Sequence, residues 1–197
     1  MSIIKANRWE TTSGVLRSTI LQTVTVMSNT NYTYTMSDIG GAGSSYGDSE
    51  AGVDISPLSI TITPQFANSK ILITYNTLWG ISGGNYVVIR VKRGIAPSGP
   101  SYNSSAAWMN TMNGFPGTNT FRGTASITGY SGSHSPVNNT FCIVDTPNTT
   151  AAITYLPNVK GEADNSATFY LNRIHYNNND YGMTSGISTV TAMEIAQ

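Results

Sequence analysis

Lys70-Ile-Leu-Ile-Thr-Tyr-Asn-Thr-Leu-Trp-Gly80 is the stretch of sequence that decides the fold. Its large apolar side chains follow the two-residue period of a β-strand, in which neighbouring side chains point to opposite faces. One face carries Ile71, Ile73, Tyr75 and Trp79, and the other carries Leu72 and Leu78. Because both faces are apolar, the sequence predicts a strand covered twice, by its own core and by a neighbouring subunit. The alternative is a two-layer core with a few aromatic residues at its edges.

The same alternation recurs on both sides of this stretch. Leu58, Ile60 and Ile62 alternate with polar residues before Pro64, and residues 86–93 direct valine and isoleucine one way and Arg90 and Lys92 the other. The face that carries Arg90 and Lys92 is expected to be either exposed to water or paired with acidic side chains. Further strands are expected at 15–27, 32–36, 120–130, 137–145, 152–159, 168–175 and 187–195. With no helical period in view, the pattern predicts an all-β antiparallel sandwich.

The length of 197 residues suits one domain with a short arm. Residues 1–14 are polar except for Ile3, Ile4 and Trp9, with Arg8 beside the tryptophan, and we interpret them as an N-terminal arm. This arm either docks onto another protein through those four residues or folds back onto its own domain. Residues 15–197 then form a single sandwich, interrupted by glycine-rich and polar loops at 37–52 and 96–105.

Composition narrows the class of protein. Only 10% of the residues are charged, against about 25% in an average soluble domain. The formal net charge is zero, so the field that attracts nucleic acid is missing. The sequence has no apolar run long enough to cross a bilayer and no signal peptide at its start, which predicts a protein made in the cytoplasm and not inserted in a membrane. Its low charge indicates a surface covered by partners or kept soluble by hydroxyl and amide groups.

Catalytic motifs are missing, and we expect neither an enzyme nor a cofactor. Cys142 lies between Phe141 and Ile143, which predicts a packed thiol. His134 and His175 have no carboxylates at ligand spacing, so no metal site is expected. Four acids near the loop at 38–54 leave a calcium site open as an alternative. A further pair of acids is typical of a solvent-exposed turn. The loop acids are Asp38, Asp48, Glu50 and Asp54, and the pair is Glu162 and Asp164.

Two polar segments with aromatic residues are candidates for surface contacts. The first runs from 108 to 117 and the second from 176 to 182, and aromatic faces flanked by amides are typical of sugar-binding surfaces. The alternative is that the first segment packs at a subunit interface and that the second is a hairpin tip. The candidate contact residues are Trp108, Asn110, Asn113, Phe115, Tyr176, Asn178 and Tyr181.

Several ordered landmarks resemble one known family. They are Ser69-Lys-Ile-Leu-Ile-Thr74, Val88-Ile-Arg-Val-Lys-Arg-Gly94, Phe141-Cys-Ile-Val-Asp-Thr-Pro-Asn-Thr-Thr150, Ile153-Thr-Tyr155, Phe169-Tyr-Leu-Asn-Arg173 and Ser188-Thr-Val-Thr-Ala-Met-Glu-Ile195. Together with the opening segment, they are similar to tail-fibre-like structural proteins of tailed bacteriophages, particularly cyanophages.

This resemblance implies a virion structural protein with a jelly-roll head like those of tumour-necrosis-factor-like and C1q-like domains. It implies a homotrimer whose arm lies next to the particle, where we expect contacts with other virion proteins. Contact of the distal loops with a host surface glycan is left open. The chain lacks a coiled-coil or collagen-like shaft, so a short fibre, a head fibre and a capsid-decorating protein all stay open. A carbohydrate-binding, lectin-like module is the alternative from another class.

Overall fold

The structure is a computed structural model, and it describes residues 19–35, 53–82, 86–98, 125–128, 136–161, 168–174 and 185–197. This part of the chain consists of strands and one 3-10 turn, Ser56–Leu58, with no α-helix. The strands are β1 (Ile20–Ser28), β2 (Tyr32–Thr35), β3 (Val53–Asp54), β4 (Ile60–Ile62), β5 (Lys70–Ser82), β6 (Tyr86–Ile95), β7 (Ala125–Thr128), β8 (Val137–Asp145), β9 (Ile153–Gly161), β10 (Thr168–Leu171) and β11 (Ser188–Ile195).

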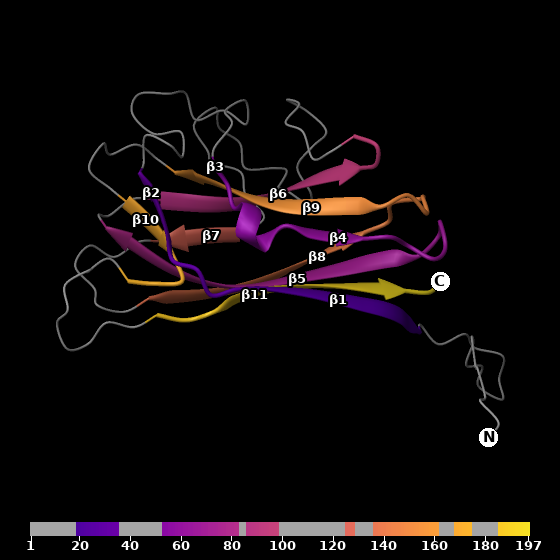
Figure 1. The fold of residues 1–197 in the computed structure, drawn as a ribbon, viewed down its shortest axis with the longest axis horizontal. Helices are drawn as coiled ribbons and strands as arrows, with labels where there is room; N and C mark the ends of the chain where they lie inside the picture. Colours follow the sequence, from indigo (N-terminus) through magenta and orange to yellow (C-terminus); the bar gives the residue numbers. More distant parts are fainter. Residues whose placement is uncertain are drawn as a thin grey trace, which may run out of the picture.

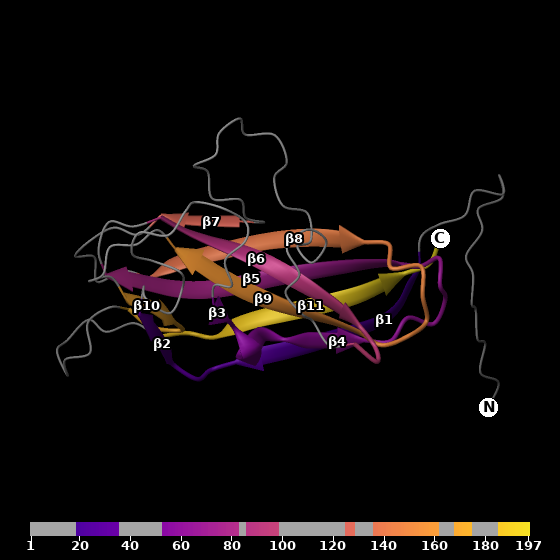
Figure 2. The same ribbon diagram turned by 90° about the horizontal axis from the view of Figure 1, so that it is seen from above.

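The strands form two antiparallel sheets, which lie one above the other in Figure 1 and are seen from above, with strands of one crossing those of the other, in Figure 2. In the first sheet, β8 pairs with one edge of β5, while β11 and β10 pair one after the other with the opposite edge. β1 and β2 continue this sheet beyond β11 and β10. In the second sheet, β9 lies between β6 and the short strands β3 and β4, and β7 pairs with β6. The predicted all-β antiparallel sandwich is confirmed.

The connections between the sheets have the order of a jelly roll. The chain passes from β1 in the first sheet to β4 in the second, returns to β5, and crosses again to β6 and β7. It then repeats the alternation with β8, β9 and β11. Treating β1–β2, β3–β4 and β10–β11 as interrupted strands leaves two sheets of four strand positions each, the arrangement of the jelly roll.

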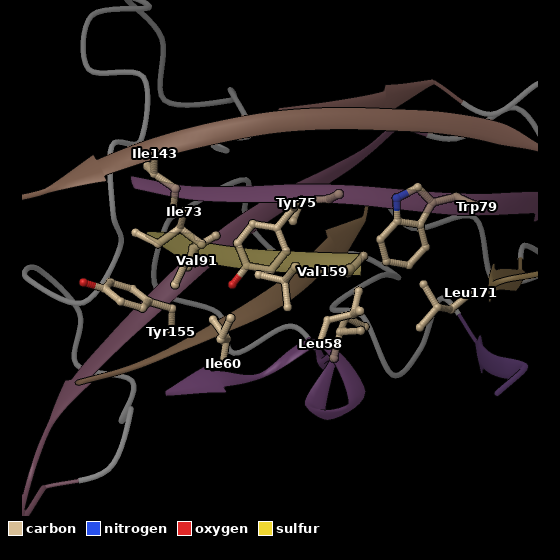
Figure 3. Close-up of a cluster of buried hydrophobic side chains, with 14 of the residues drawn as sticks. Leu58, Ile60, Ile73, Tyr75, Trp79, Val91, Ile143, Tyr155, Val159 and Leu171 are labelled. Carbon is tan, nitrogen blue, oxygen red and sulfur yellow. The ribbon is translucent and has the colours of Figure 1, made fainter. Parts of the chain in front are cut away.

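The core lies between the layers and confirms the face assigned from the sequence. Ile71, Ile73, Tyr75 and Trp79 of β5 are all fully buried. Figure 3 shows Ile73 and Tyr75 in one cluster with Tyr155 and Val159 of β9, and Trp79 farther along β5. The ring centroids of Trp79 and Phe169 are 4.3 Å apart, and the indole nitrogen of Trp79 donates a hydrogen bond to the Thr77 hydroxyl over 2.6 Å.

Two expected strands have different bounds from those predicted. Leu58, expected to begin a strand, is the last residue of the 3-10 turn, and the strand itself covers only Ile60–Ile62. The strand expected at 168–175 ends at Leu171, because Asn172 takes a left-handed backbone conformation with φ of 66°. Asparagine adopts that conformation more readily than most residues.

Asn172 is buried and lies where the two interrupted strands of the first sheet, β1–β2 and β10–β11, break. Its side-chain nitrogen donates to the carbonyl oxygens of Ser28 and Thr30, over 2.8 and 2.9 Å. Its side-chain oxygen accepts a 2.5 Å hydrogen bond from the Ser188 hydroxyl, which in turn accepts one from the Leu78 amide. These bonds satisfy backbone groups that the interrupted ladder leaves without strand partners. Asn172 therefore keeps the first sheet continuous where its strands break.

Candidate functional site

The outer face of the first sheet is the most distinctive surface of the described part. A row of small side chains crosses its four strands, from Thr25 of β1 through Thr191 of β11 and Thr74 of β5 to Cys142 of β8. The hydroxyl oxygens of Thr25 and Thr191 are 3.1 Å apart and form a hydrogen bond. Because the side chains at these facing positions are small, the row protrudes little from the sheet.

Larger apolar groups lie in the rows on either side. Thr23, Met193, Leu72 and Val144 form one row, in the same strand order. The other row ends at Met27 of β1, which is 71% exposed. Val144 is 50% exposed, although apolar side chains of that size are usually buried. The apolar groups are therefore spread across the surface among threonines.

Charged side chains are confined to the two ends of this surface. Lys70 lies at one end of β5, on the opposite face from the buried Ile71. At the other end, the Arg173 guanidinium lies 4.4 Å from the centre of the Tyr170 ring and donates to the Thr33 hydroxyl over 2.6 Å. Between these ends, the outward positions of β1, β11, β5 and β8 carry no charge. We call this surface the uncharged face.

Cys142 corrects one prediction from the sequence. Its apolar neighbours predicted a packed thiol, but Cys142 is exposed on β8, the edge strand of the uncharged face. The reason is the strand period, since the buried Ile143 points inward and directs its neighbour outward. Leu72 and Leu78 are also only half-buried, so the single chain covers one face of β5 and leaves the second open.

The outer face of the second sheet is different, because it carries charges that are buried. Arg90 is 1% exposed and Lys92 is 6% exposed. The Lys92 ammonium lies 2.5 Å from a carboxylate oxygen of Asp54, and Arg90 donates to the side-chain oxygen of Asn158 over 2.9 Å. Asn158 in turn donates to Asp54 over 2.7 Å. Of the two possibilities left open by the sequence, pairing with an acid is confirmed for Lys92.

A second polar cluster links the two sheets from within. Asp145 of β8 accepts hydrogen bonds from Arg93 of β6 and from the Tyr155 hydroxyl of β9, each over 2.8 Å. Burial raises the pKa of Tyr155, and the negative charge of Asp145 and its hydrogen bond raise it further, against the opposing effect of Arg93. Tyr155 therefore stays neutral and acts as a hydrogen-bond donor. The cluster fixes the distance between the layers and is structural.

Glu194 of β11 is the other acid of the first sheet, and it is also buried. Its carboxylate accepts hydrogen bonds from the side chain of Gln22 over 2.6 Å and from the backbone amides of Gln65 and Phe66 over 2.8 and 3.2 Å. Burial by itself would raise the pKa of Glu194, but these hydrogen bonds outweigh it and hold the pKa below its ordinary value. Glu194 thus anchors the turn that leads from β4 to β5.

The site residues predicted from the sequence lie outside the described residues. This holds for the arm candidates Ile3, Ile4, Arg8 and Trp9 and for the contact candidates Trp108, Asn110, Asn113, Phe115, Tyr176, Asn178 and Tyr181. Of the acids proposed for calcium, only Asp54 is described. Within the described ranges, no three histidine, cysteine or acidic residues are grouped as metal ligands. The same ranges contain no helix long and apolar enough to cross a membrane.

Sequence reasoning found only part of the uncharged face. The apolar second side of β5 was recognised, but its alignment with the threonines of β1 and β11 was not. Those strands are more than 100 residues apart in the chain, as the register of Thr25 with Thr191 shows. The sequence did contain a signal for this face. The outward-facing residues of its strands include threonine, methionine, leucine, valine and asparagine but no acid.

No protein-family model and no curated protein matches the chain. Among solved structures, it is similar to the infectious bursal disease virus Gx strain, the virus's VP2 subviral particle and its Gt strain, with TM-scores of 0.39, 0.38 and 0.37 and identities of 14, 12 and 8%. Each match covers 98% of this chain but only 42 to 46% of the other, so the chain spans less than half their length. Likeness at this level carries no argument about function.

Proposed function

We propose that this chain is a non-enzymatic structural protein of a virus particle, which works by assembling with copies of itself. The observation that carries the proposal is the uncharged face, exposed on a jelly-roll sandwich in which two described ion pairs, Lys92 with Asp54 and Arg93 with Asp145, form within the chain. Jelly rolls build viral capsid domains, lectins and cupins, so the fold alone does not choose among them. An open, uncharged surface favours protein assembly.

In the finer form of the proposal, the chain is a short homotrimeric fibre or spike subunit of a tailed bacteriophage. Residues 1–14 anchor it to the particle, and distal loops contact the host surface. The sequence landmarks support this form, because they include residues that define the sandwich, such as Asp145, Tyr155 and Asn172. A capsid-decorating protein is the alternative within the same class, and it differs in assembling only on the particle.

Light scattering of the purified full chain tests the self-assembly. A homotrimer has three times the chain mass of 21.0 kDa, and the number of subunits should stay at three without residues 1–14 if the sandwich forms the interface. A monomer would reject the free trimer and favour the decorating protein.

The virion role has a separate test, which is mass spectrometry of gradient-purified virus particles. The full chain should be found in particles, and the chain lacking residues 1–14 should be lost from them. Absence of the full chain from particles, combined with retention on a glycan array that Trp108→Ala abolishes, would replace the proposal with a lectin-like module.

A further inference from the structure

We infer that the uncharged face is the surface through which copies of this chain contact one another, with Cys142 inside the contact. This inference rests on the self-assembly proposed above and names the surface responsible. The occupant is a second copy of the same chain, as the charge, the area and the exposure of this face indicate.

Charge limits what can cover the face. Charged groups of a partner would lose their hydration against a surface that offers no opposite charge between Lys70 and Arg173, which is costly. The partner surface must therefore be almost uncharged as well. An average soluble protein has about 25% charged residues and rarely provides such a surface, whereas each further copy of this chain brings one.

The charges at the two ends of the uncharged face are also compatible with a second copy of the chain. Lys70 and Arg173 are both positive and the face has no acid, so a partner chosen by charge would be an acidic protein or a polyanion. Arg173, however, is already engaged with the Tyr170 ring and Thr33. These two residues lie at the border, where interfaces are typically polar and hydrated, and they leave the centre to apolar and hydroxyl contacts.

The area of the face is sufficient for a specific contact. Strands lie about 4.8 Å apart and same-face residues about 6.8 Å apart, so four strands with four outward positions each cover on the order of 500 Å². Two such faces bury roughly 1,000 Å² in total, which is the lower bound of specific protein interfaces. Met27 and Val144 add large exposed apolar groups to that area.

Symmetry explains why one face is enough. A two-fold axis brings the same patch of two copies together, whereas each contact around a three-fold axis joins two different patches, so both patches of a trimer contact must lie on the uncharged face. In the trimer, three such faces turn toward the common axis. The second apolar side of β5, with Leu72 and Leu78, is then covered by neighbouring copies, while the first is covered by the core of its own chain.

Cys142 provides a built-in test, because it is the single cysteine of the chain. We would measure its reaction rate with a maleimide in the full-length chain, with the mass of each sample measured by light scattering. The matched control is Thr61→Cys in a Cys142→Ser background. Thr61 is exposed on the outer face of the second sheet and pairs its hydroxyl with Thr154, as Thr25 does with Thr191.

In the assembled protein, we expect Cys142 to react at least tenfold more slowly than the control cysteine, and to recover the control rate when dilution dissociates the assembly. If Cys142 reacts at the control rate while the mass is that of a trimer, the inference is wrong, although self-assembly still holds. A monomer with reactive Cys142 at every concentration overturns the inference as well. The virion role is then decided separately by the particle analysis.

Substitution tests the same surface independently. Thr74→Lys places a charge in the centre of the face and should reduce the mass to that of one chain, whereas Thr61→Lys should leave the mass unchanged. Thr140→Lys, at an exposed position of β8, serves as a second variant if Thr74→Lys fails to fold. Folding is checked by circular dichroism, and a folded Thr140→Lys variant that still forms a trimer would also contradict the inference.

Discussion

The outer faces of the two sheets differ in where they keep their charges. On the second sheet, Arg90 and Lys92 point outward, yet they are buried and bonded to Asn158 and Asp54. On the first sheet, the outward positions between Lys70 and Arg173 are uncharged, and both acids, Asp145 and Glu194, point inward. One face is thus satisfied within the chain, and the other has little hydration to lose when a protein covers it.

The largest expected effect is the loss of stability when Asp145, a buried acid of the first sheet, is replaced. Asp145→Ala removes the acceptor of both Arg93 and the Tyr155 hydroxyl, so we expect the free energy of unfolding to fall by about 3 kcal/mol. Urea unfolding measures the change. Asp145→Asn is the control, since its amide oxygen still accepts one of the hydrogen bonds and should recover part of the loss. Equal losses in both variants would contradict this role.

The buried charge of the second sheet should have a smaller effect. Asp54→Ala removes a carboxylate partner of the Lys92 ammonium, and we expect a loss of about 2 kcal/mol, reduced because the Asp54 side chain is 37% exposed. The double variant Asp54→Ala, Lys92→Met should be more stable than Asp54→Ala alone, because it no longer buries the ammonium group. A double variant less stable than the single one would show that Lys92 is stabilised by other contacts.

Glu194 predicts how stability depends on pH. Its folded-state pKa lies below the ordinary value of 4.5, so its hydrogen bonds contribute fully above pH 4.5. That contribution is lost as the pH falls through the folded-state pKa, since protonation removes the charged acceptor. We expect Glu194→Gln to have a shallower loss of stability in this acidic range than the parent, measured by urea unfolding at a series of pH values. Parallel pH profiles for the two proteins would contradict this.

The smallest effect is expected on the uncharged face. Thr25→Ala should change the free energy of unfolding of the single chain by no more than about 0.5 kcal/mol, because an exposed threonine has little packing to lose. The assembled mass should also vary little between low and high salt, since the contact has no charge to screen. A mass that falls steeply with added salt would show that Lys70 or Arg173 dominates the contact.

Strand positions were predictable to a large extent. The alternation within 70–80 placed Ile73, Tyr75 and Trp79 on the core face, and all three are buried. The strand ends were less predictable, because a turn such as that at Asn172 depends on partners at Ser28 and Ser188. The expected arm and surface-contact residues lie outside the described residues and stay predictions.

The sequence by itself determined the strand period and the class of fold, because alternation depends on neighbours one or two residues apart. It also determined the scarcity of charge, which is a property of composition. Only the tertiary structure decided which groups meet. Asp145 joins Arg93, 52 residues away, to Tyr155, and Glu194 reaches Gln22 across 172 residues. The uncharged face belongs to the same category, because register alone aligns Thr25, Thr191, Thr74 and Cys142. Alternation orients each side chain within its strand, but only sheet pairing can assemble a surface from four strands.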